Sequence, residues 1–104
     1  RKNLGVPGGR KTIIELCQTR HVILLDDDVD FASFDLICQS VTKGFKDDAR
    51  IKAIAFNIRE FVSRKHNRYE IPHKNKAIDM NKEFLTYLVI GAGCALDVEA
   101  VRRV

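Results

Sequence analysis

The stretch HVILLDDDVDF, residues 21–31, joins a short apolar segment to a cluster of carboxylates. Val22 to Leu25 predict a buried strand. Four acidic residues follow its carboxyl end: Asp26, Asp27, Asp28 and Asp30. So many carboxylates close together repel one another unless water or a cation takes up their charge.

Two interpretations of this cluster stay open at the level of sequence. One is a solvated acidic turn in which Asp30 caps the next helix. The other is a cation site, because Asp26 and Asp28 would point to the same side if the chain stayed extended. Hard divalent ions such as Mg²⁺ and Mn²⁺ choose oxygen ligands, and ligands of α/β sheets bind beyond the carboxyl ends of the strands.

Helical patterns stand on either side of this strand. Ile13, Leu16 and Cys17 have the spacing of one helix face, so residues 9–19 predict a short helix after a glycine-rich loop. Apolar residues at helical period from Phe31 onward predict a second helix that ends around Gly44.

Two further apolar runs, residues 51–58 and 84–90, predict strands. The glycines of residues 91–93 predict a tight turn, and Asp97 predicts the cap of a last helix from Val98 onward. The order of helix, strand, helix and strand is typical of an α/β fold with a largely parallel sheet.

Composition excludes several classes of protein. With 45% apolar and 31% charged residues over 104 positions, the chain is typical of one globular domain and not of a disordered tail.

Residues 59–83 lose all periodicity and predict an irregular basic loop. Tyr69 is the one aromatic residue inside that loop's basic run, so nucleic acid is not an expected partner. The three cysteines are far apart and predict reduced core thiols.

The glycine-rich opening GVPGGRKT, residues 5–12, is close to a phosphate-binding loop but lacks its pattern. Arg10 stands where the last glycine of that motif is required, and no strand precedes it in this chain. We therefore expect a turn that backbone or ligand can approach closely, with Arg10 as a rigid cationic group beside it.

Four segments together resemble the inverting family-two glycosyltransferases with the A-type fold. They are N-x-G-x-x-G-G-R at residues 3–10, LDDD at 25–28, IKAIAFNI at 51–58 and FLTYLVIGAGCALDVEAVRRV at 84–104. The resemblance implies a three-layer Rossmann-like α/β fold with a mostly parallel sheet. It also implies that residues 1–104 are the central part of a single catalytic domain, truncated at both ends.

The resemblance assigns roles to individual positions. Arg10 matches the arginine that reaches the nucleotide base, although Lys11 stands where an asparagine is common. Asp26 or Asp27 lies near the ribose, and Asp28 is the ligand of a divalent metal, Mn²⁺ or Mg²⁺. The turn on the acceptor side is formed by three residues: Gly91, Ala92 and Gly93. Leu96 and Asp97 replace arginines of many relatives, which weakens any acceptor contact there.

The implied reaction transfers a sugar from a UDP- or dTDP-linked donor to a hydroxyl of a saccharide or lipid-linked acceptor, with inversion. The catalytic base lies downstream in the family, so none of Asp79, Glu83 and Asp97 is assigned that role, and the fragment is expected to be inactive alone. The basic run at residues 64–76 is either a solvated loop, a flap over the diphosphate or a contact for a lipid-linked or polyanionic acceptor. The full protein is expected to be bacterial and cytoplasmic, or peripherally associated with the cytoplasmic face of a membrane.

A competing interpretation is a receiver-type signalling domain that binds Mg²⁺ through the acidic cluster. That family needs a later apolar strand that ends in a phosphorylatable aspartate. Asp79 is the best candidate, but the polar segment PHKNK precedes it.

Overall fold

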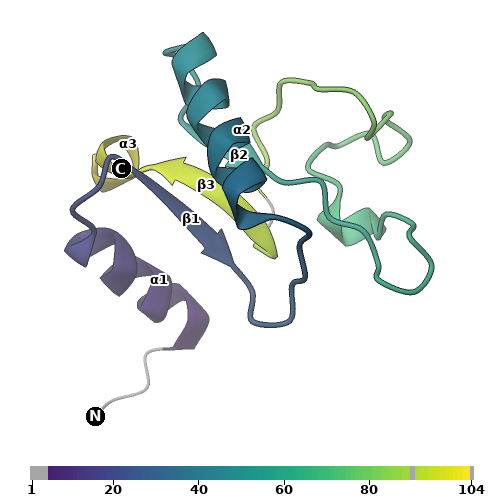
Figure 1. The fold of residues 1–104 in the computed structure, drawn as a ribbon, viewed down its shortest axis with the longest axis horizontal. Helices are drawn as coiled ribbons and strands as arrows, with labels where there is room; N and C mark the ends of the chain where they lie inside the picture. Colours follow the sequence, from purple (N-terminus) through teal and green to yellow (C-terminus); the bar gives the residue numbers. More distant parts are fainter. Residues whose placement is uncertain (1–4, 90, 104) are drawn as a thin grey trace.

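A computed structural model describes residues 5–89 and 91–103. Within these residues the chain forms three strands in one sheet, with helices on both sides of it (Figure 1). In chain order the elements are α1 (Gly5–Leu16), β1 (His21–Leu25), α2 (Phe34–Asp47), β2 (Ala53–Ala55), the 3₁₀ helix η1 (Arg68–Glu70), β3 (Gly93–Asp97) and α3 (Val98–Arg102).

Both pairings of the sheet are antiparallel. β3 lies in the middle, and its Ala95 is opposite Ile23 of β1 on one side and Ile54 of β2 on the other. β1 and β2 therefore run in the same direction without pairing with each other. The predicted Rossmann-like fold with a mostly parallel sheet is wrong, because an unpredicted strand separates the two strands that the α/β pattern would have paired.

Small residues explain why β3 takes the central place. A Cβ atom on Gly93 would lie 3.0 Å from Phe56 and 3.2 Å from Ile58, and the next inward residue, Ala95, is fully buried. The strand predicted at residues 84–90 is not formed over 84–89, where Leu85 and Tyr87 are exposed, and residue 90 lies outside the described part. The strand follows the glycine turn instead of preceding it.

One face of the sheet forms the core with α2. Val41 and Phe45 of this helix pack with Ala95, and Ile23 and Ile54 join them from the neighbouring strands. Ser33 caps α2 by accepting a hydrogen bond from the backbone N–H of Leu36.

Gly44 does not end α2, which continues to Asp47. A Cβ atom on this glycine would lie only 2.8 Å from Cδ1 of Ile54. The glycine lets the helix approach β2 closely, so its role is in packing rather than in termination.

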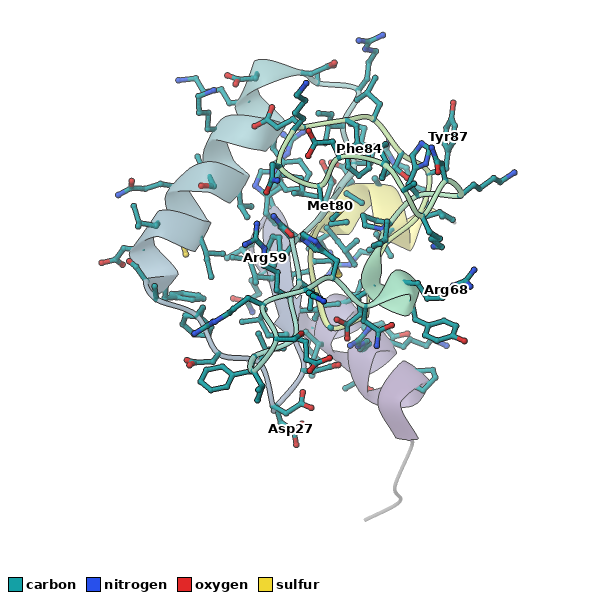
Figure 2. The ribbon with its side chains drawn as sticks, turned by 90° about the vertical axis from the view of Figure 1, so that its right-hand side faces the viewer. Asp27, Arg59, Arg68, Met80, Phe84 and Tyr87 are labelled. Atoms are coloured by element: carbon teal, nitrogen blue, oxygen red, sulfur yellow. The ribbon has the colours of Figure 1, made fainter. Side chains whose placement is uncertain are left out.

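The other face of the sheet carries α1 and α3. Figure 2 shows α2 on one side of the strands and these two helices on the opposite side. α1 begins at Gly5, so the glycine-rich segment that was expected to be a loop is helical, and the helix ends at Leu16 instead of residue 19. The Arg102 side chain donates to the carbonyl oxygens of Ile14 and Cys17, each at 2.7 Å, and so satisfies backbone groups at the end of α1.

The long segment between β2 and β3 contains one short regular element, η1, among its described residues. It lies beside the sheet, away from α1 (Figure 1). In the described part of the chain, no helix is long and apolar enough to cross a bilayer. Cys94 is buried, while Cys17 and Cys38 are half-buried, and all three thiols are free.

Two glycine substitutions test the packing of β3. We expect Gly93→Ala to lower the free energy of unfolding by about 1–3 kcal/mol, because the new methyl group overpacks the space beside Phe56. Gly9→Ala is the matched control, since a Cβ there meets nothing within 4 Å in helix α1, and alanine should raise stability by about 0.5–1 kcal/mol. Chemical denaturation measures both. A neutral or stabilising Gly93→Ala would contradict the position given to β3.

Candidate functional site

The acidic segment turns sharply where β1 ends. The backbone N–H of Val29 donates to the carbonyl oxygen of Asp26 at 3.3 Å, and Asp27 and Asp28 form the centre of this turn. The chain is therefore not extended beyond the strand, and the premise that placed Asp26 and Asp28 on one side does not hold.

Arg10 brings three distant segments together at this turn. Its Nη2 donates to Oδ1 of Asp26 at 3.0 Å and to the carbonyl oxygen of Gly91 at 2.6 Å. Arg10 is 16 residues from Asp26 and 81 residues from Gly91 in the sequence. Helix α1, the end of β1 and the turn before β3 thus share one guanidinium group.

The glycine turn runs alongside the acidic turn. The backbone N–H of Asp26 donates to the carbonyl oxygen of Ala92 at 3.1 Å, which extends the pairing of β1 and β3 by one contact. A Cβ atom on Gly91 would touch Arg10, with 3.4 Å between that atom and Nη1. A longer side chain at this position would meet the guanidinium, so glycine leaves the space that Arg10 occupies.

The remaining aspartates differ in their surroundings. Asp30 accepts a hydrogen bond from the backbone N–H of Phe31, but Ser33 and not Asp30 caps α2. Asp27 and Asp28 are exposed, and neither side chain forms a hydrogen bond or ion pair with any other described residue. Figure 2 shows Asp27 at the outer edge of the molecule.

The carboxylates of Asp27 and Asp28 are too few to hold a metal ion by themselves, but they could bind one that is already bound to another ligand. Among residues 5–89 and 91–103, no group of three or more His, Cys, Asp or Glu side chains could hold a metal ion. Mg²⁺ is commonly bound by one or two carboxylates together with substrate phosphates and water. Asp28, with Asp27 beside it, offers that number of oxygen donors.

Cys94 is a buried residue of β3, close enough to Arg10 and Asp26 for their charges to act on its thiol. Burial raises the pKa of its thiol, while the Arg10 guanidinium opposes this effect and Asp26 adds to it. A buried thiol with a raised pKa stays protonated and is a poor nucleophile. We therefore treat Cys94 as part of the core and not as a reactive group.

The structure assembles part of the predicted site. Arg10, Asp26, Gly91 and Ala92 are in direct contact, and Asp27 and Asp28 continue the same turn. Gly93 lies inside the sheet, where it is buried. The expected contact between Arg10 and a nucleotide base stays a prediction; both hydrogen bonds that hold Arg10 use Nη2, so Nε and Nη1 are the donors that could address a ligand.

Sequence reasoning missed Arg102, which fixes the end of the helix that carries Arg10. Its guanidinium contacts the backbone of α1 across 88 residues of sequence. No local pattern indicates this contact, because a basic residue in the last turn of a helix is ordinary and its partners belong to another element.

Two of the acidic residues that were not assigned as a catalytic base, Asp97 and Asp79, have structural roles. Asp97 is 4% exposed, and its Oδ1 accepts a hydrogen bond from the backbone N–H of Ala100 to cap α3. In the strand pairing, Asp97 of β3 lies opposite His21 of β1. This is the end of the sheet far from Asp26. Asp79 accepts from the backbone N–H of Asn81 in a turn, and no strand ends there as a receiver domain would require.

Comparison with known proteins adds a relative but no activity. No family model matches the sequence, and no solved structure matches it. A Haemophilus influenzae protein described as "Uncharacterized protein" is 44% identical over 102 residues, which cover 98% of this chain and 55% of the relative. The chain thus spans about half the length of the curated relative that it matches.

The cap at Asp97 should make stability depend on pH. The hydrogen bond from Ala100, helped by the charge of Arg20, holds the pKa of Asp97 below its ordinary value of 3.8. The stabilisation is complete above 3.8 and is lost as the pH falls through the lowered pKa. Asn at this position keeps a capping oxygen without the charge. We expect the melting temperature of the unmodified protein to exceed that of Asp97→Asn at neutral pH.

This difference should shrink as the pH falls below 3.8, because the protonated aspartic acid and the asparagine are then both neutral. Thermal unfolding followed by circular dichroism at a series of pH values measures it. A difference that stays constant across the series would show that the charge of Asp97 does not stabilise the fold.

Proposed function

We propose that this chain contributes the nucleotide-diphosphate side of the donor site of an inverting, nucleotide-sugar-dependent glycosyltransferase. The supporting observation is the contact of Arg10 with Asp26 and Gly91. Each of these residues belongs to a different segment of the family-two resemblance, and the segments meet although they are far apart in the sequence. The support lies in this site and not in the sheet, whose predicted strand directions were wrong.

The chemistry of the donor explains why such groups would be gathered. A nucleotide sugar, UDP- or dTDP-linked, releases a nucleoside diphosphate, and negative charge grows on the diphosphate oxygens as the bond to the sugar breaks. Fixed cationic and dipolar groups stabilise such charge without reorganisation. A Mn²⁺ or Mg²⁺ ion held by Asp28 would add Lewis-acid stabilisation at the same place.

The chain's own residues would orient this assembly. Arg10 holds the carboxylate of Asp26 at the end of β1, from where Asp26 or Asp27 would accept hydrogen bonds from the ribose hydroxyls. Asp28 exposes its carboxylate on the same turn, so it is accessible to a cation that is already bound to a diphosphate. Gly91 and Ala92 form the backbone segment next to Asp26, and an acceptor hydroxyl would approach along this segment.

We assign no catalytic base to Asp79, Glu83 or Asp97, because the base lies downstream of the matching segments in the family that this chain resembles. Asp97 is also a buried cap, and Asp79 belongs to a turn. The acceptor, a saccharide or a lipid-linked saccharide, and the base that deprotonates it belong to the proposal for the whole protein. That protein would act in the cytoplasm or at the cytoplasmic face of a membrane.

Nucleotide binding in the presence of metal tests the proposal. We expect UDP and Mn²⁺ to bind together far better than either binds alone, because one or two exposed carboxylates hold the ion weakly without phosphate ligands. Asp28→Asn should reduce the Mn²⁺-dependent affinity for UDP by roughly tenfold or more, since it removes the charged ligand. Isothermal titration calorimetry measures both effects.

Asp47→Asn is the matched control, because Asp47 is an exposed aspartate at the far end of α2. It should leave UDP affinity unchanged. The function would be refuted if Mn²⁺ did not change UDP affinity, or if Asp28→Asn bound UDP and Mn²⁺ as tightly as the unmodified protein. Binding of beryllofluoride with Mg²⁺ in place of UDP would instead support a receiver-type phosphoacceptor.

A further inference from the structure

A closed loop at residues 60–65 carries exposed apolar side chains away from the core. The backbone N–H of Glu60 donates to the carbonyl oxygen of Lys65 at 2.8 Å, and that of Arg64 donates back to Glu60 at 2.9 Å. Arg64 has a φ of 60°, the left-handed conformation that lets a short loop close. Within this loop Phe61 is 65% exposed and Val62 is 87% exposed.

The root of the loop is fixed to another segment. Asn57 contacts His66 at 2.5 Å, between Oδ1 and Nε2, and donates to the carbonyl oxygen of Met80. Arg59 donates to Oδ1 of Asn81 at 2.9 Å. Figure 2 shows Arg59 and Met80 near each other at this root. The base of the loop is therefore fixed, while the side chains of Phe61 and Val62 are exposed beyond it.

Basic residues are frequent in and next to this loop in the sequence. Residues 59–69 contain one acidic residue, Glu60. They contain four Lys or Arg residues: Arg59, Arg64, Lys65 and Arg68. The Arg64 guanidinium lies 5.0 Å from the centre of the Phe61 ring. Further along the sequence, Tyr69 is 83% exposed, with the Arg68 guanidinium 5.9 Å from the centre of its ring.

We propose that the surface formed by residues 59–69, here called the basic loop surface, docks on a lipid bilayer that carries anionic headgroups. Phe61 and Val62 would enter the boundary between headgroups and acyl chains, the cations would pair with lipid phosphates, and Tyr69 would lie at headgroup level.

A bilayer explains the composition better than nucleic acid does. Single-stranded nucleic acid is bound by stacking bases on aromatic rings, but Val62, the most exposed apolar residue of the loop, is aliphatic and cannot stack. The ring of Phe61 has a guanidinium beside it. An aliphatic side chain at the tip gains from hydrocarbon and not from bases.

Vesicle co-sedimentation tests this surface without nucleotide or metal, so the result is independent of the proposed glycosyltransferase activity. The protein should bind vesicles of phosphatidylcholine mixed with phosphatidylglycerol and not vesicles of phosphatidylcholine alone. The double variant Phe61→Ser/Val62→Ser should bind the mixed vesicles about tenfold more weakly. Leu36→Ser is the matched control, because Leu36 is 61% exposed beside the acidic Asp35; it should bind normally.

Charge variants separate the loop from the overall positive charge of the protein. Arg64→Gln and Lys65→Gln should each weaken binding about fivefold, the effect expected for one cation near an anionic surface. Lys46→Gln removes the same charge from α2 and should weaken binding by less than about twofold. Equal effects of all three variants would overturn the proposal, since only general attraction to anions would then act.

An introduced tryptophan reports insertion directly, because the chain contains none. The emission of Phe61→Trp should shift to shorter wavelength with the mixed vesicles, while that of Leu36→Trp should not shift. Unchanged binding by the double serine variant, or binding without a shift for Phe61→Trp, would overturn the proposal. So would binding to short single-stranded DNA that is lost in the same variants while vesicles remain unbound.

Discussion

The proposed site depends on the hydrogen bonds that the Arg10 guanidinium donates to Asp26 and Gly91. The guanidinium joins the first helix, the end of the first strand and the turn before the central strand. The side chains of Arg10 and Asp26 are 28% and 44% exposed, and exposed pairs of this kind contribute at most about 1 kcal/mol to stability. The pair is therefore a weak source of folding energy, and its main effect is on where the carboxylate points.

The charges of the four aspartates after β1 are accommodated in different ways. Arg10 compensates the charge of Asp26, and a backbone N–H bonds Asp30. Asp27 and Asp28 remain exposed to solvent on the turn. The structure therefore shows a solvated turn, and a cation on it stays a proposal that would use Asp28, with Asp27 beside it, and not the pair Asp26 and Asp28.

Local patterns predicted the elements whose residues determine their own structure. The apolar run of β1, the helical period of α2 and the capping side chain of Asp97 each act over a few residues, and each element was predicted near its observed position. β3 could not be predicted in this way. The more apolar residues 84–90 have stronger strand character, but the face of the central strand that packs against Phe56 and α2 holds the small residues Gly93 and Ala95, and a Cβ atom at Gly93 would already be crowded. Tertiary packing, and not local preference, selected the strand.

The same distinction applies to the site. Residue type and resemblance predicted Arg10, Asp26 and the glycine turn as parts of one site, but not the hydrogen bonds that join them. The role of Arg102 at the end of α1 depends on carbonyl groups about 85 to 88 residues away, and no sequence pattern encodes it.

A double-mutant cycle between Arg10→Gln and Asp26→Asn, measured as affinity for UDP in the presence of Mn²⁺, tests this role of Arg10 most directly. If Arg10 acts by orienting Asp26, the two substitutions are strongly coupled, and the double variant binds no more weakly than the weaker of the two single variants. Losses that simply add in the double variant would show that the two residues act independently, and they would contradict a site organised by their contact.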